Sequence, residues 1–441
     1  MTILDRRTFL AGSGIALATA AAAPRTFASV ATQPNAWADV RASFRLRRDL
    51  IHLSSFFLVS HPKPVRDAVE RYRDMLDADP FETVERHCFG KPEENLALRV
   101  KRAAASYLGG RPEEVALTQS TTAGLALVYL GLPLGPGQEI LTTTHDHYVH
   151  HEASRLAAAR AGATVRRVPL FDRFEELPAV TEQAIVARLR EAIRPATRVL
   201  GITWVHSQSG LKLPLAAIAA AVREVNAGRP ERERVRVVVD GVHGFGVEDV
   251  AVAGTGIDVF VSGTHKWIFG PRGTGLVWAR AEVWAEMAPT IPTFDGLAPY
   301  EAWEKGEPPA GPPRADWFTP GGFHAFEHAW AVEAAFAFHA SIGRARIAER
   351  IHALNARIKD GLSRNRRVRL WTPRSPDLSA GLVGFDVEGM ATGAVVEGLL
   401  RRRVVASGSP YPRSVVRLAA GIMNTEEEID LAVKAVAELS A

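Results

Sequence analysis

The sequence predicts an α/β fold, in which a mostly parallel central sheet is flanked by helices and joined to a smaller α+β domain. Short apolar runs alternate with helix-like segments between residues 115 and 278, a pattern typical of a buried parallel sheet. This rhythm changes after residue 321, where short strands and helices follow in another order. A chain of 441 residues is also too long for one ordinary core, and it therefore indicates two packed domains.

Strands of the large domain are expected where apolar or β-branched runs are bounded by turn residues. The expected strands are 115–118, 139–143, 164–168, 198–203, 235–239, 258–262 and 275–278. Helices are expected where apolar residues recur at helical spacing, at 62–76, 94–108, 123–130, 149–160 and 215–225. Residues 293–322 are rich in Pro and Gly, and we expect a long surface loop there.

The smaller domain is expected to combine short strands with helices. The expected strands are 382–387, 404–406 and 415–418, and the expected helices are 326–341, 392–401 and a final helix that opens with the capping box Thr425-x-x-Glu428. We therefore divide the chain into a large domain at 61–320 and a C-terminal small domain at 321–441, with residues 29–60 as an N-terminal part of the small domain.

The first 28 residues are interpreted as a targeting segment. Arg6 and Arg7 precede an alanine-rich stretch at 11–23, and small residues around Ala28 would suit a signal peptidase. This arrangement resembles a twin-arginine signal, which directs folded proteins to export machinery, so we expect a periplasmic or otherwise exported protein. An N-terminal anchor or a chance pair of arginines is the alternative.

Charge and composition limit the possible partners. Lys and Arg exceed Asp and Glu by 53 − 49 = 4, and two of these charges lie in the first 28 residues. Because the remaining charge is nearly balanced, we expect no nucleic-acid-binding surface. No long apolar run follows the signal, so we also expect no membrane span in the mature form. Cys88 stands alone, which excludes an intramolecular disulfide and favours a packed cysteine over a catalytic thiol.

The residues that carry chemistry lie between positions 240 and 275. Asp240 ends a β-branched run, and a carboxylate at the end of a buried strand needs a positive partner or several donors. Lys266 follows the next expected strand within a turn of small residues. An acid and a lysine at neighbouring strand ends can hold a pyridine ring between them, because the acid keeps the ring nitrogen protonated while the lysine forms an imine and moves protons.

Three motifs in this region carry a resemblance to a known family. They are Asp240-x-x-His243, His265-Lys266 about two dozen residues later, and Gly270-Pro271-Arg272-Gly273-Thr274-Gly275. In this order they resemble the class V aminotransferase family of fold-type I pyridoxal phosphate (PLP) enzymes, and within it the isopenicillin N epimerase-like branch. The resemblance implies PLP as the cofactor, with Lys266 holding it as a Schiff base and Asp240 at the ring nitrogen.

The resemblance also implies a phosphate site at Thr121 and Thr122, with His265 touching the same group. Free amides at the start of a helix attract an anion, which agrees with this assignment. The family's acidic residue in this turn is replaced by Ala123. The alternatives are a simple Ser/Thr helix cap at 120–122 and a structural role for His265.

Further positions are implied around the ring. His147 matches the residue that stacks on the ring, with Tyr148 as the rival, while Ser207 and His243 match groups near the phenolic oxygen. A metal site formed by His145, His147, His150 and His151 is the alternative, but no cysteine or clear acidic ligand set accompanies them, so we expect no metal.

Arg417 is implied to bind the substrate α-carboxylate, because an Arg in the family stands seven residues before Asn-Thr, as it does here. A surface arginine on an edge strand is the alternative. In the family a Gly-Thr pair after this long loop contacts the cofactor phosphate of the neighbouring subunit. Thr319 is shifted from that position, so the amides of Gly321 and Gly322 are the candidates for this contact. Residues 406–411 contain no cysteine, so we expect no cysteine-persulfide desulfurase chemistry.

Three functions remain open at this point. The first is an aminotransferase or epimerase that acts on an α-amino acid or a peptide-like amine. The second is a lyase that breaks a C–S or other β bond, and the third is a non-catalytic PLP-binding relative. The resemblance further implies a homodimer with its sites at the subunit interface.

Overall fold

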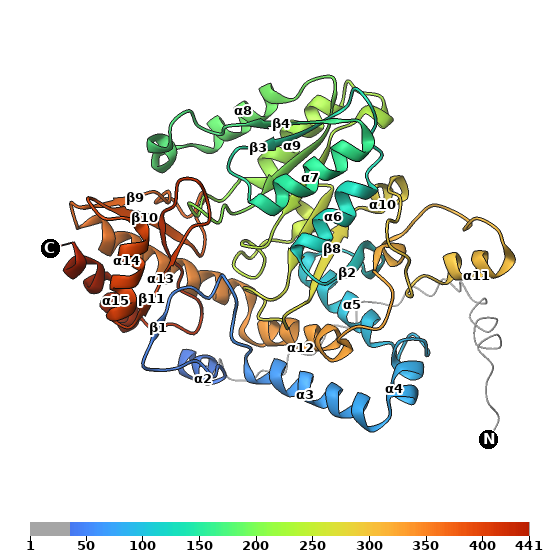
Figure 1. Ribbon diagram of the computed structural model, residues 1–441, viewed down its shortest axis with the longest axis horizontal. Coiled ribbons are helices and arrows are strands. Elements are labelled where there is room, and N and C mark those ends of the chain that lie inside the picture. Colours follow the sequence, from blue (N-terminus) through green and yellow to red (C-terminus); the bar gives the residue numbers. More distant parts are fainter. Residues whose placement is uncertain (1–35, 441) are drawn as a thin grey trace.

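The computed structural model describes residues 36–440, so the predicted signal peptide at 1–28 lies outside the described residues (Figure 1). Within this range a seven-stranded sheet forms the centre of the molecule, in the order β2-β8-β7-β6-β5-β3-β4. All neighbouring strands are parallel except those beside β8, which runs antiparallel to β2 and β7. The predicted mostly parallel sheet is confirmed. The strands are β2 (Val115–Thr118), β3 (Glu139–Thr143), β4 (Thr164–Val168), β5 (Thr197–Thr203), β6 (Arg236–Asp240), β7 (Val259–Gly263) and β8 (Gly275–Ala279).

The central strands of the sheet are buried on both faces, which explains why they are continuous apolar runs. Along β6, Val238 packs in a cluster with α6 and α7, whereas Val237 and Val239 belong to a second cluster with α5, α8, α9 and α12. Side chains alternate between the faces of a strand, so each valine in turn serves a different helical layer. The helices of these layers are α5 (Leu96–Leu108), α6 (Thr121–Gly131), α7 (Tyr148–Ala161), α8 (Glu182–Ala192), α9 (Leu215–Asn226) and α12 (Phe326–Ile342).

A second, antiparallel sheet lies toward the C-terminus, in the order β12-β13-β10-β9. Its strands are β9 (Val368–Leu370), β10 (Val383–Val387), β12 (Ser407–Gly408) and β13 (Val416–Leu418), and the helices beside it are α13 (Arg344–Ser363), α14 (Thr392–Arg401) and α15 (Glu426–Leu439). The predicted capping box is confirmed, because the Thr425 hydroxyl accepts from the Glu428 amide while the Glu428 carboxylate accepts from the Thr425 amide.

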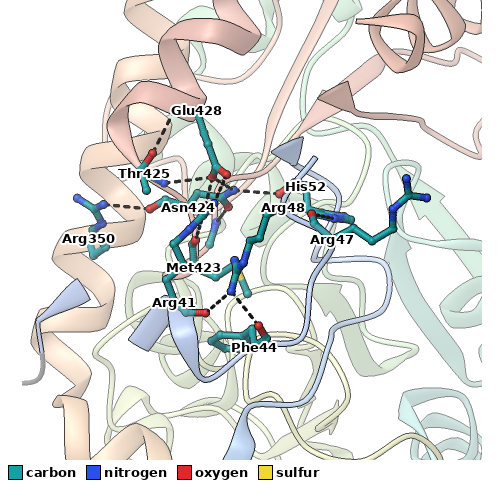
Figure 2. A network of polar contacts seen from close by, with 11 residues as sticks. Arg41, Phe44, Arg47, Arg48, His52, Arg350, Met423, Asn424, Thr425 and Glu428 are labelled. Carbon is teal, nitrogen blue, oxygen red and sulfur yellow. Dashed lines mark hydrogen bonds and ion pairs between the residues drawn. The ribbon is translucent and has the colours of Figure 1, made fainter. Parts of the chain in front are cut away.

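The N-terminal segment lies along the C-terminal elements, as the blue and red ribbons of Figure 1 show. Strand β1 (Ile51–His52) pairs in parallel with β11 (Val404–Val405). Before it, Arg41 at the end of α2 (Trp37–Ala42) binds both carboxylate oxygens of Glu428 and the carbonyl of Met423 (Figure 2). Segments more than 350 residues apart in sequence therefore form one polar network.

The remaining helices are α3 (Lys63–Ala78), α4 (Pro80–His87), α10 (Ala281–Glu286) and α11 (Leu297–Lys305). Val283 and Trp284 of α10 pack in the cluster that contains Val238. Helix α12, although it follows the large sheet in sequence, packs against α3 and α5. No helix among residues 36–440 combines the length and apolarity that a membrane crossing requires.

The expected elements need correction: α2, α4, α8, α10 and β9 were not predicted, and two further differences concern α11 and α13. The expected loop at 293–322 contains α11, which lies between Gly296 and a left-handed Gly306; the proline of this helix lies in its first turn, where it is tolerated. Helix α13 was absent from the prediction, although Ile347, Ile351 and Leu354 recur at helical spacing and are buried.

Candidate functional site

Asp240 and Lys266, the central residues of the predicted site, lie at the ends of neighbouring parallel strands. Asp240 is the last residue of β6, and Lys266 follows the neighbouring β7 by three residues. Polar side chains collect at this edge because the carboxyl ends of parallel strands open on the same side of the sheet. His243 lies in the turn after β6, and its Nε2 is 3.2 Å from the Lys266 Nζ.

The environment of Lys266 makes its amine reactive. Burial lowers the pKa of Lys266 to about 8, while the Asp240 carboxylate opposes this shift and the Arg417 guanidinium adds to it. A substantial fraction of the amine is therefore neutral just above neutral pH, as a lysine nucleophile requires. Burial also holds the pKa of His243 well below its usual range, and the charge of Lys266 acts in the same direction.

Asp240 is a buried carboxylate, 4% exposed, that accepts a hydrogen bond from the Val242 amide. Burial raises the pKa of Asp240, and the charges of His150 and Lys266 and the Val242 amide oppose the shift. A buried acid of this kind is stabilised by a cationic N–H partner such as a protonated pyridine.

A cradle for an anion lies where α6 begins. The Thr121 hydroxyl accepts from the Gly263 amide at 2.8 Å, and a Cβ placed on Gly263 would lie 2.6 Å from the His265 ring. The Nδ1 of His265 is buried and has no hydrogen-bond partner among residues 36–440. Ser120 provides the helix cap, and Thr122 is exposed at the second position of the helix. A phosphate would supply the acceptor that this buried nitrogen lacks.

His147, rather than Tyr148, faces the site. His147 caps α7 and its ring lies edge-on to Tyr411, at 6.0 Å between ring centroids. Tyr148 is 70% exposed. Burial lowers the pKa of His147, and the nearby charges of Asp240 and Lys266 also act on it, in opposite directions.

The other histidines of this region have separate partners. His145 stacks on Phe171 with 4.2 Å between centroids, and the Nε2 of His150 lies 2.6 Å from the Tyr129 hydroxyl. His151 lies 2.8 Å from the Thr143 carbonyl. No cluster of three or more His, Cys, Asp or Glu suited to a metal ion occurs in the described part of the chain.

Arg417 is buried, with 4% exposure, so the alternative of a surface arginine is wrong. Its two terminal nitrogens donate to the carbonyls of Ser207 and Gly408, each at 2.8 Å. Its Nε is buried without a hydrogen-bond partner in the described range. Burial lowers the pKa of Arg417 to about 10. The remaining N–H groups of this fixed guanidinium are suited to a carboxylate.

Ser207 lies on the arginine side of the site. Its hydroxyl is 2.7 Å from the Tyr411 hydroxyl, and its carbonyl holds Arg417. Tyr411 and Phe56, whose ring lies against Arg417, were not predicted. Tyr411 ends the stretch 406–411 that lacks a cysteine, and Phe56 lies in an apolar stretch of the sequence at 49–59.

Cys88 and Thr319 line one cavity together with Thr118 and Thr264. Burial raises the pKa of the Cys88 thiol to about 12. The Thr319 hydroxyl accepts from the Leu117 amide, and the Gly321 amide donates to a carbonyl of its own chain. The Gly321 amide is therefore already engaged, which weighs against the idea that it binds a neighbouring subunit's phosphate.

The fold and the site together define a cofactor-dependent α/β protein that presents a lysine between a buried acid and an anion cradle. Residues 60–431 match the family model described as Aminotransferase class-V, and the chain belongs to this family. PLP is therefore its cofactor. The orphaned nitrogens of His265 and Arg417 and the buried Asp240 fit a phosphorylated, cationic ring with a carboxylate substrate beside it.

Individual relatives differ in their chemistry. The isopenicillin N epimerase of Streptomyces clavuligerus is 27% identical over 404 residues, which covers 89% of this chain and 96% of the relative. A cysteine desulfurase of Klebsiella pneumoniae is 32% identical over 194 residues, 43% of this chain and 44% of the relative. The solved complex of the cystine C–S lyase C-DES with cysteine persulfide matches with a TM-score of 0.77 and 23% identity, over 89% of this chain and 98% of that one.

The lowered pKa of Lys266 can be measured directly. Acetic anhydride reacts only with neutral amines, so competitive acetylation of the apoprotein, followed by peptide mass spectrometry, should show labelling of Lys266 that rises through pH 8. Asp240→Asn removes the charge that raises this pKa, and the midpoint should then move to lower pH. A midpoint unchanged by this substitution would contradict an electrostatic link between the two residues.

Proposed function

We propose that this PLP-dependent enzyme acts on the Cα–H bond of an α-amino acid, or of a peptide-like amine with a free carboxylate, as an aminotransferase or epimerase. One observation carries the proposal: the Lys266 amine, with its lowered pKa, lies within the electrostatic reach of both Asp240 and Arg417. An amine near both an acid that suits a ring nitrogen and a cation that suits a carboxylate supports this proposal.

In this proposal each site residue has a defined role toward the cofactor. Thr121, Thr122 and His265 hold its phosphate, and Asp240 holds its ring nitrogen. His147 would stack on the ring, and Ser207 and His243 would hold its phenolic oxygen. Lys266 binds the cofactor covalently. When bound, PLP supplies an electron-accepting ring that weakens the Cα–H bond.

Arg417 and Lys266 then divide the work on the substrate. Arg417 fixes the α-carboxylate and so orients Cα toward the Lys266 Nζ, which removes the proton. Return of a proton by the chain to the opposite side of Cα would give epimerisation, and delivery of the proton by Lys266 to the bound cofactor instead would lead to transamination. The neutral imidazole of His243, 3.2 Å from Nζ, can hold the amine in place during these transfers.

A C–S or other β-lyase is the second candidate, and the likeness to a cystine C–S lyase and to cysteine desulfurases favours it. Its desulfurase form is disfavoured. Residues 406–411 contain no cysteine, and burial raises the pKa of the Cys88 thiol to about 12, which disfavours a reactive thiolate. A lyase that releases its sulfur product directly needs no such thiol.

A product screen of the holoenzyme with D- and L-amino acids separates these candidates. Transamination converts a supplied 2-oxo acid into an amino acid, epimerisation inverts Cα with uptake of deuterium from D₂O, and a lyase releases pyruvate or sulfide. Lys266→Ala should lower every such rate by at least about a thousandfold, and it should prevent borohydride, which removes the yellow colour by reducing the imine, from fixing the cofactor to the chain. A holoprotein whose spectrum responds to no amine would favour a non-catalytic relative.

The proposed role of Arg417 is tested by comparing substrates that have a carboxylate with amines that lack one. Arg417→Gln should raise the KM for amino acids by on the order of a hundredfold, because a buried charged contact is lost. The KM for the matching decarboxylated amines should change little. Equal effects on both substrate classes would contradict a carboxylate-binding role.

We further propose that two copies of the chain form a homodimer. Phe323 and Phe294 are 73% and 55% exposed and lie 6.2 Å apart, beside the Gly321–Gly322 turn, and exposed aromatic groups of this kind often mark an interface. Light scattering of the holoenzyme should give about twice the chain mass. A mass equal to one chain at micromolar concentration would refute the dimer.

Export through the twin-arginine route is proposed from residues 1–28 alone. A folded reporter fused behind residues 1–35 should reach the periplasm, and the pair Arg6→Lys and Arg7→Lys should retain it in the cytoplasm. Export of the double-lysine fusion would show that the arginine pair is not read as a signal.

A further inference from the structure

We propose that Phe56, supplied by the N-terminal segment, is a positioning residue for Arg417 that keeps its guanidinium available to a carboxylate. This inference rests on the proposed function, since it assigns to Arg417 the binding of the substrate carboxylate. It extends that function to a segment that lies before the large domain in sequence and contains none of the residues predicted for the site.

Phe56 lies in direct contact with the site. The side chain is 1% exposed, and the Arg417 Cζ lies over its ring at 4.7 Å from the centroid. The same ring lies 5.8 Å from the imidazole of His243, which in turn approaches the Lys266 amine. One aromatic side chain therefore packs against both the arginine and the histidine beside the lysine.

The charge of Arg417 explains why an aromatic partner is useful. No acidic side chain within residues 36–440 forms an ion pair with Arg417, although the guanidinium is buried. Its two terminal nitrogens are held by backbone carbonyls, and the ring of Phe56 covers one face. A ring face stabilises a cation without occupying its N–H groups, whereas a carboxylate partner would compete with the substrate.

Backbone hydrogen bonds set the position of Phe56 relative to Arg417. The Leu53 amide donates to the Val405 carbonyl at 3.0 Å, and the Ala419 amide donates to the Leu53 carbonyl at 2.8 Å. Ala419 lies two residues after Arg417, so the N-terminal segment is in register with the chain that carries the arginine. This pairing fixes the place at which Phe56 enters the site.

A polar clasp holds the same segment to the C-terminal elements (Figure 2). Arg41 donates to both carboxylate oxygens of Glu428 and to the Met423 carbonyl, and the Asn424 amide group donates to the His52 carbonyl. The ion pair is partly buried, with 24% and 12% side-chain exposure for Arg41 and Glu428. The clasp therefore joins the residues before and in β1 to residues 423–428, which follow the Arg417 strand and begin α15.

The test titrates the holoenzyme with two small probes, and the visible absorption of the cofactor reports the binding of each. Acetate reports carboxylate binding without an amine, and methylamine reports reaction at Lys266 without a carboxylate. Phe56→Leu keeps apolar bulk but removes the ring face, so the Kd of acetate should rise about five- to twentyfold. The Kd of methylamine should stay within about twofold.

Matched controls lie next to the tested residues. Phe57 is 71% exposed, so Phe57→Leu should leave both probes unaffected. Arg47 forms an exposed pair with Asp49, so Arg47→Gln should also be neutral, whereas Arg41→Gln, which opens the clasp, should weaken acetate binding in the same direction as Phe56→Leu. If Phe56→Leu lowers the melting temperature severely, Phe56→Met replaces it, because a flexible thioether fills the same space.

The outcomes distinguish this inference from the proposed function. Equal acetate affinities in Phe56→Leu and Phe57→Leu would overturn the inference, even if the wild-type enzyme turns over amino acids. Parallel losses for acetate and methylamine would also overturn it, because they would indicate general disruption. A selective loss of acetate binding would support it, even if the product screen fails to find amino-acid turnover.

Discussion

The site depends on the burial of charge at the carboxyl ends of β6 and β7. Asp240 is a carboxylate removed from water, and the Lys266 amine nearby has a pKa lowered to about 8 by the same burial. Neither group has the solvation of an exposed charge, because both are buried. Each therefore requires a polar partner that the surrounding apolar strands do not provide. A cationic aromatic cofactor that reacts with an amine meets both requirements at once.

Hydrogen-bond donors on two sides of Asp240 and Lys266 provide the remaining features of the site. The start of α6, the Gly263 amide and the orphaned His265 nitrogen form one pole, which suits an anion. Arg417, held by two carbonyls, forms a second pole on the C-terminal sheet. Because the second pole lies on different elements from the first, the packing of the two parts of the chain determines the distance between them.

Much of the sheet was predictable because its strands are short apolar runs with clear ends. The predicted strands of the large sheet agree with the structure to within one residue at each end. Helix α11 was missed because Pro and Gly were interpreted as loop signals, although the glycines bound a helix there. Helix α13 was missed despite a regular apolar spacing. The order β2-β8-β7-β6-β5-β3-β4 was not derivable, because local patterns carry no information about which strands become neighbours.

The sequence by itself determined the class of chemistry, since an acid, a lysine and a glycine-rich turn at fixed spacing leave few alternatives. Only the tertiary structure decided that Arg417 is buried, that His147 rather than Tyr148 faces the site, and that Phe56 and Tyr411 join it. The physical reason is that exposure and contact depend on which distant segments pack together. Residues 41 and 56 lie more than 350 positions before residue 417 and are brought to it only when β1 pairs with β11 and Arg41 binds Glu428.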